Sequence, residues 1–245
     1  MPLAMNVSLV FAGRQRELTK LNSLYAQRKH VLLIGPPGIG KSALLQQVRL
    51  HSPILLCEET SKLSRICDGL ERQLGWTHYR LNVIERKNRL LTYMERRGEP
   101  VAFDHVAQTP PRIARFMAHL REHVPSWIVC RSELPHDIGR VWEYLTDFVR
   151  VHVPPFTIAE TRLLVAQAVA KGTIQQDTLN QVALLHRLSK GNPRILEELL
   201  VSEEKIDKAA RQKIESQTRI IPEGSPEWMI LYHKYYNDEV KKLGI

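Results

Sequence analysis

A glycine-rich octapeptide at residues 35–42 constrains this chain more than any other feature. It reads Gly-Pro-Pro-Gly-Ile-Gly-Lys-Ser, follows the apolar run at 31–34 and precedes a helical pattern that begins at Ala43. Strand, glycine-rich turn and helix, in this order, are the context that a phosphate-binding loop requires. The sequence therefore predicts an α/β fold that binds a nucleoside triphosphate.

Each residue type in the loop has a physical role. Glycines let successive backbone N–H groups point inward at phosphate oxygens, and the following helix adds the positive end of its dipole. Lys41 places an ammonium on the β- and γ-phosphates, and Ser42 offers a hydroxyl to Mg²⁺. We expect ATP or ADP with Mg²⁺ as cofactors. The predicted contacts are Gly35, Pro36, Pro37, Gly38, Ile39, Gly40, Lys41, Ser42 and Ala43.

Apolar strands alternate with helical patterns up to residue 155. Strands are predicted at 31–34, 54–57, 100–104, 127–130 and 148–153, and helices at 61–74, 79–97, 111–123 and 137–146. This alternation predicts a parallel sheet with helices on both faces, as in P-loop NTPases. After residue 155 the pattern is helical only, at 158–171, 178–188 and 195–205. We therefore expect an α/β core at 1–155, a small helical lid at 156–205 and a helical tail at 206–245.

Two polar residues stand at the carboxyl ends of predicted strands, one as the last residue of its strand and one directly after its strand. Ligands on parallel sheets bind at the carboxyl ends of the strands, so both residues are expected beside the loop. Asp104 is the expected partner of Ser42 in orienting Mg²⁺; the alternative is a solvated acid that opens a loop. Arg131 is expected to reach the γ-phosphate, with a surface salt bridge as the alternative.

Net charge favours anionic partners. The chain of 245 residues has a formal charge of +9, and basic residues crowd the stretch 80–97. Such charge suits duplex DNA, although solvated helix faces often have the same composition. Three cysteines without a C-x-x-C pair favour reduced thiols and a cytoplasmic location. No apolar run approaches ~20 residues, so we expect no membrane partner.

The motifs together resemble the AAA+ superfamily and its STAND branch of signal-transduction ATPases. The stretch 11–18, Phe-Ala-Gly-Arg-Gln-Arg-Glu-Leu, is similar to the box that precedes the loop in those families and borders the adenine. Residues 154–156 resemble their lid entry, and 191–194, Gly-Asn-Pro-Arg, their lid motif. The resemblance implies nucleotide contacts from Phe11, Gly13, Arg14, Pro155, Pro193 and Arg194. The expected catalytic set is Asp104, Arg131 and Arg194, together with His105, whose imidazole could orient water beside Asp104.

Two positions depart from the family pattern. His105 stands where hydrolysing relatives place a second acid, and a neutral imidazole is not the usual base. Asp147 stands where an arginine finger is expected. Hydrolysis is therefore expected to be slow.

Three hypotheses remain open from the sequence. The first is an ATP-binding, slowly hydrolysing switch whose lid closure controls a partner protein. The second is a DNA-transaction ATPase, a transposition or replication regulator that assembles on duplex DNA as a nucleotide-dependent homo-oligomer. The third is a scaffold that binds the nucleotide without hydrolysing it.

Overall fold

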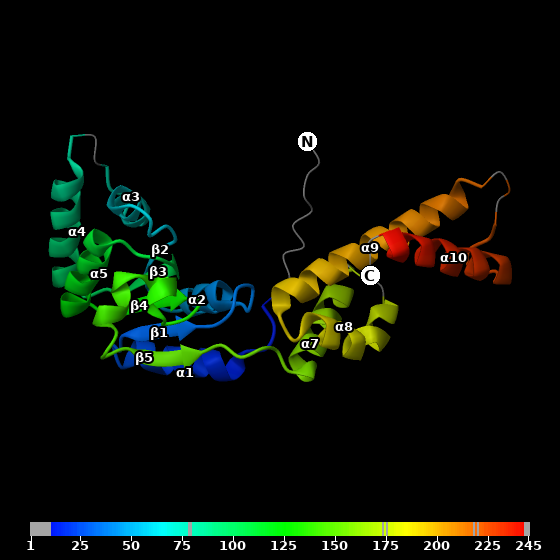
Figure 1. Cartoon of the computed structure of the whole chain (residues 1–245), viewed down its shortest axis with the longest axis horizontal. Coiled ribbons are helices and arrows are strands. Elements are labelled where there is room, and N and C mark those ends of the chain that lie inside the picture. Colours follow the sequence, from blue (N-terminus) through cyan, green and yellow to red (C-terminus); the bar gives the residue numbers. More distant parts are fainter. Residues whose placement is uncertain are drawn as a thin grey trace. The chain divides into compact units, whose positions relative to one another are not determined.

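The computed structural model describes residues 11–77, 80–172, 174, 176–217, 219 and 221–242. The chain divides into two compact units (Figure 1). The core unit is Gly13–Pro155, and the helical unit is residues 1–12 with 156–245. The core unit carries the sheet, whereas the described part of the helical unit contains helices alone.

Five parallel strands form the sheet, in the order β2-β3-β4-β1-β5. Their bounds are β1 Val31–Ile34, β2 Leu55–Cys57, β3 Val101–Val106, β4 Ser126–Cys130 and β5 Val149–His152. The four residues of β1 are all buried, as expected of a parallel sheet covered on both faces. The predicted parallel α/β architecture is confirmed.

Helices connect the strands of the core unit. They are α1 Gln15–Ala26, α2 Lys41–Arg49, α3 Leu63–Gln73, α4 Val83–Arg97, α5 Pro111–His123 and α6 Pro135–Ile138, followed by the 3₁₀ helix η1 Arg140–Tyr144. Helix α4 begins later than the predicted residue 79, which lies outside the described residues. Asn82 sets the start, because its side chain accepts from the amides of Ile84 and Glu85 while the Glu85 carboxylate accepts from the Asn82 amide.

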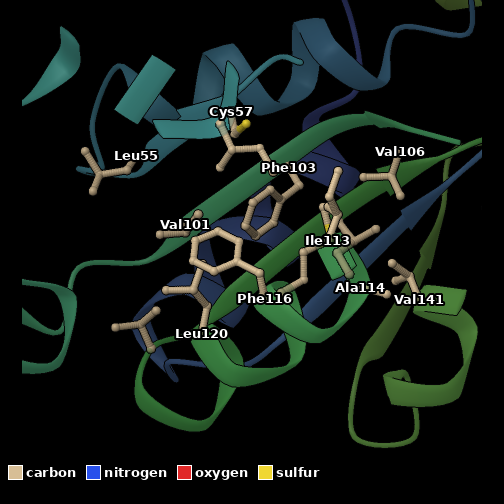
Figure 2. Packing of buried hydrophobic residues seen from close by; sticks show 14 of the residues in the cluster. Leu55, Cys57, Val101, Phe103, Val106, Ile113, Ala114, Phe116, Leu120 and Val141 are labelled. Atoms are coloured by element: carbon tan, nitrogen blue, oxygen red, sulfur yellow. The ribbon is translucent and has the colours of Figure 1, made fainter. Parts of the chain in front are cut away.

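The main hydrophobic core joins one face of the sheet to helices α3, α4 and α5. Figure 2 shows Phe103 of β3 and both Ile113 and Phe116 of α5 directed into this layer. Full burial of one such side chain stabilises the fold by about 1.5–3 kcal/mol. This packing holds the strand that carries Asp104.

One charged group is buried between α3 and α4. Arg86 is 5% exposed and donates from Nε and Nη2 to Glu71 Oε2, over 2.8 and 2.6 Å. Its Nη2 also donates to Asp68 Oδ1 over 2.6 Å. Arg86 therefore cross-links two helices, and the prediction that it belongs to an exposed basic face is wrong.

The helical unit contains α7 Ile158–Ala170, the 3₁₀ helix η2 Gln176–Gln181, α8 Val182–Ser189, α9 Pro193–Glu215 and α10 Pro226–Lys242. Helix α9 continues ten residues past the predicted end at 205, because Ile206, Ala210 and Ile214 maintain a buried stripe. Helices α9 and α10 pack side by side (Figure 1). In the part of the chain that the structure describes, no helix combines the length and apolarity needed to cross a membrane.

Candidate functional site

The turn between β1 and α2 has the curled backbone of an anion-binding loop. Gly38 and Gly40 have φ values of 76° and 96°, a region that favours glycine. A Cβ added at Gly35 would lie 3.0 Å from Ile39 Cγ2 and 3.2 Å from the Val153 carbonyl oxygen. Gly40 precedes α2, and no side-chain hydrogen bond caps the helix there. The first-turn amides of α2 are thus available to an anion.

Lys41 is held at the mouth of this curl. Its Nζ donates to the carbonyl oxygens of Gly35 and Pro36, over 2.7 and 2.9 Å. Burial lowers the pKa of Lys41, while the nearby Cys130 and Asp104 oppose that shift. Ser42 is partly buried beside it, and Pro36, Pro37 and Ala43 are exposed. The loop thus presents an ammonium and amide donors together.

A β-bulge in β3 carries the next two site residues. Phe103 pairs with Ile128 and Val106 with Cys130, so β3 has one residue more than β4 across the same interval. Bulges often re-aim side chains beside functional sites. The inserted backbone conformation is that of His105, whose φ is 54°.

The bulge gives its two polar residues opposite environments. Asp104 is 3% exposed, and its Oδ1 accepts from the His105 amide over 2.8 Å. The His105 side chain is 72% exposed, with Nε2 3.7 Å from Asp104 Oδ2. The structure therefore brings Asp104 into the electrostatic environment of Lys41 and leaves the imidazole in solvent.

Arg131 follows β4 at the same edge of the sheet. Ile34 of β1 pairs with Cys130 of β4, so the start of the loop and Arg131 leave neighbouring strands at one level. The Arg131 side chain is exposed, and no hydrogen bond or ion pair engages it among the described residues. The alternative expectation, that Arg131 forms a surface salt bridge, is thus not observed among the described residues.

Arg14 of the predicted adenine box has a structural contact that the sequence did not predict. The residue is 3% exposed with φ of 62°. Its Nη1 donates to the Pro154 carbonyl and its Nη2 to the Ile39 carbonyl, the latter over 3.1 Å. Gly13 also has a positive φ, of 70°. Arg14 thus ties the loop to the segment that leaves β5.

Other predicted nucleotide contacts lie at the unit boundary or beyond it. Pro155 is exposed at the end of the core unit, and Phe11 is partly buried in the helical unit. Pro193 is the first residue of α9, where its missing N–H costs no hydrogen bond. Arg194 follows it with a 70% exposed side chain, and its Nε lies 3.0 Å from Glu198 Oε1.

Asp147, at the position expected for an arginine finger, forms ion pairs within the core unit. Its Oδ1 accepts from Arg121 Nη1, and its Oδ2 lies 3.7 Å from His30 Nε2. Through these contacts Asp147 links Arg121 and His30 within the core unit. The sequence did not predict that the thiol of Cys130, at the end of β4, would lie close enough to Lys41 for the ammonium to oppose the rise that burial causes in the pKa of this thiol.

Comparison with known sequences gives short or uninformative matches. A family model described as a protein of unknown function, DUF507, matches residues 160–245, less than half of the chain. A putative lon protease homolog of Methanothermobacter thermautotrophicus is 44% identical over 41 residues. That match covers 17% of this chain and 8% of the homolog, so it says little about the whole protein.

Comparison with solved structures is more informative. The Orc1 protein of Aeropyrum pernix, in complex with DNA, has a TM-score of 0.62 at 18% identity, over 98% of this chain and 68% of its own. Cdc6p from Pyrobaculum aerophilum has a TM-score of 0.60 at 15% identity, covering 95% and 81%. The RuvB Holliday junction branch migration motor of Thermotoga maritima has 0.53 at 15% identity, covering 93% and 70%. The glycine-rich loop at 35–42 follows β1, and a helical unit follows the sheet. In both respects the chain has the fold of the AAA+ P-loop ATPases.

Proposed function

We propose that this chain binds ATP with Mg²⁺ at residues 35–42. The observation that carries the proposal is the position of Lys41, whose ammonium rests on two loop carbonyls in the field of the buried Asp104 carboxylate. Charge-assisted bonds to phosphate oxygens are stronger than bonds to neutral carbonyls. A triphosphate therefore offers this ammonium better acceptors than the loop itself does.

The residues of the loop fit a phosphate chain in a second respect. The amides at the start of α2 have no side-chain cap, and the helix dipole is positive there. The backbone would hold the phosphates, while Ser42 and Asp104 would hold the magnesium ion. Mg²⁺ prefers oxygen ligands and, when bound, neutralises charge on the β- and γ-phosphates.

Hydrolysis at this site is proposed to be slow. The bulge places the His105 imidazole in solvent, and the sequence after Asp104 provides no second carboxylate. Arg131 is the cation at the sheet edge that would meet the γ-phosphate. An arginine finger is worth about 10³–10⁵ in rate, and the acid Asp147 occupies its expected position.

We further propose that the nucleotide regulates the helical unit through Arg194. The exposed pair between Arg194 and Glu198 contributes about 0–1 kcal/mol, so a phosphate can replace Glu198 at small cost. Phe156, where the helical unit begins, donates from its amide to the Gly191 carbonyl over 2.7 Å. A shift of Arg194 would thus reach the lid motif and change what the helical unit presents to a partner protein.

The DNA-transaction hypothesis is the second candidate. It is supported by the net charge of +9 and by a fold like that of Orc1, which was solved with DNA. With Arg86 buried, the basic surface that remains includes Lys87, Arg112 and Arg115, which line a hollow of about 430 Å³ beside α4 and α5. Such a surface would hold DNA phosphates through counterion release.

Calorimetric titration with ATP, in the presence and absence of Mg²⁺, tests the proposed function. We expect binding that tightens with Mg²⁺, and a smaller effect of the ion in Asp104→Asn. Steady-state phosphate release then separates a slow ATPase from a scaffold. Fluorescence anisotropy with labelled duplex DNA at low salt separates the two partner classes: absence of binding with and without ATP removes the DNA candidate.

A further inference from the structure

A cluster of metal-ligating side chains lies on helices α4 and α5. His119 and His123 stand four residues apart on α5, so they share one face of that helix. Glu95, near the end of α4, meets them across the helix pair. The cluster is separate from the loop at 35–42 and plays no part in the proposed nucleotide chemistry.

The ligand atoms converge closely enough to share one ion. One nitrogen from each histidine and one carboxylate oxygen all lie within 4.8 Å of one another. His123 Nε2 is 3.3 Å from Glu95 Oε1. Two ligands at about 2.0–2.2 Å from a tetrahedral ion stand about 3.3–3.6 Å apart, so this pair already has the required separation. The His119 ring lies 5.0 Å from the His123 ring, centroid to centroid.

The ligand types select the class of ion. Two imidazoles and one carboxylate suit Zn²⁺ and similar divalent transition metals, whereas Mg²⁺ prefers oxygen ligands alone. The His119 imidazole also has a carboxylate neighbour, since Glu122 Oε2 lies 3.5 Å from His119 Nδ1. Carboxylates in this position orient a ligating ring and raise its basicity.

We propose that His119, His123 and Glu95 form a Zn²⁺ site that links α4 to α5. All three side chains are solvent-accessible, with exposed fractions of 50%, 32% and 43%. An ion therefore reaches them without unfolding, and a water can complete the tetrahedron. Within the described residues, this is the one group of three or more His, Cys, Asp or Glu side chains whose ligand atoms converge in this way.

Buried cysteine thiols compete poorly with this cluster for the ion. Burial raises the pKa of Cys57 and of Cys130 to about 12, so both thiols stay protonated near neutral pH. Metal binding requires a thiolate. The ion would add a cross-link between two core helices and stabilise the folded state by mass action.

Titration of the full chain with Zn²⁺ tests this site. The protein carries no affinity tag, is stripped with chelator and contains no nucleotide. We expect one Zn²⁺ per chain by calorimetry, and a melting temperature that rises with Zn²⁺ concentration. His119→Ala and His123→Ala should each weaken affinity roughly tenfold or more, because loss of a direct ligand exceeds the effect of an outer partner. Glu95→Gln should weaken it in the same direction.

A matched control separates this cluster from other sites. His136→Ala removes an exposed imidazole that lies beside the Asp137 carboxylate, and this variant should bind Zn²⁺ as the unmodified chain does. Equal melting temperatures without metal show that the variants fold. The proposal is overturned if the unmodified chain binds no Zn²⁺, or if His119→Ala and His123→Ala bind it as tightly as the unmodified chain.

Discussion

Arg14 Nη2 donates a hydrogen bond to the carbonyl oxygen of Ile39, over 3.1 Å, inside the core unit. The same guanidinium donates a hydrogen bond to the Pro154 carbonyl oxygen. One buried side chain therefore joins the glycine-rich loop at 35–42 to the segment that follows β5. The planar guanidinium of arginine can donate to both carbonyls at once, and no other residue type has a charged donor of this shape. The conformation of the loop therefore depends on a residue 25 positions before Ile39, within the predicted adenine box.

Arg14→Ala is expected to lower both stability and ATP affinity. It removes charged hydrogen bonds worth about 1.5–3 kcal/mol, and the carbonyl of the buried Ile39 loses this donor. Arg14→Lys should restore only part of the loss, because an ammonium lacks the planar fork. Urea unfolding and ATP titration measure the two effects, with exposed Arg16→Ala as the control. A stable Arg14→Ala protein with a normal melting curve would show that the loop needs no such anchor.

Arg86→Ala is expected to destabilise the core unit strongly. Removing the guanidinium leaves the buried Glu71 carboxylate without its ion pair, a change that costs about 3–5 kcal/mol. Arg96→Ala, exposed on the same helix, should change stability by less than about 0.5 kcal/mol. Chemical denaturation of both variants checks the contrast, and equal midpoints would contradict a structural role for Arg86.

The buried thiols predict a loss of stability in alkali. Burial raises the pKa of Cys57 and Cys130 to about 12 and that of Cys67 to about 11, from 9.0 for an unburied thiol. Because the unfolded state ionises first, this stability is fully present below pH 9 and is lost as the pH rises toward 12.

The same burial predicts slow reaction with thiol reagents. At pH 8 the folded chain should react far more slowly than free cysteine, and three thiols should react after unfolding in guanidinium. Rapid labelling of the folded chain would show that the thiols are accessible and ionised.

His105→Glu is expected to raise steady-state ATP turnover or to leave it unchanged. A carboxylate at this position adds the base that the site lacks, on a bulge that already accepts an exposed side chain. His136→Glu, at another exposed histidine beside an acid, is the control. A marked loss of turnover in His105→Glu alone would instead show that the imidazole orients the attacking water.

Local patterns were sufficient to predict most of the sheet and the loop. The strand at 31–34 and the helix at 111–123 coincide with β1 and α5, because uninterrupted apolar runs and a proline at the first helical turn are unambiguous signals. The end of α9 was not predicted, although Ile206, Ala210 and Ile214 continue an apolar stripe at helical spacing. In the sequence this stripe is interrupted by charged residues, and the packing of α9 against α10 is visible only in the structure.

The bulge and the buried arginines were also beyond sequence reasoning. A run ending in Asp104-His105 predicts a strand end, but the extra residue is visible only from the register with β4. Arg86 has the same local pattern as the exposed arginines around it, and only the acids on α3 show that it is buried. Charge runs therefore predict a basic surface less reliably than apolar runs predict a core.

Calorimetric titration of Lys41→Ala with Mg·ATP is the sharpest test of nucleotide binding at residues 35–42. Loss of a charged phosphate contact costs about 1.5–3 kcal/mol, roughly ten- to hundredfold in affinity. Lys20→Ala, on the exposed face of α1, is the matched control and should bind as the unmodified chain does. We predict a large loss for Lys41→Ala alone, whereas unchanged ATP affinity in that variant would contradict the assignment of this loop as the nucleotide site.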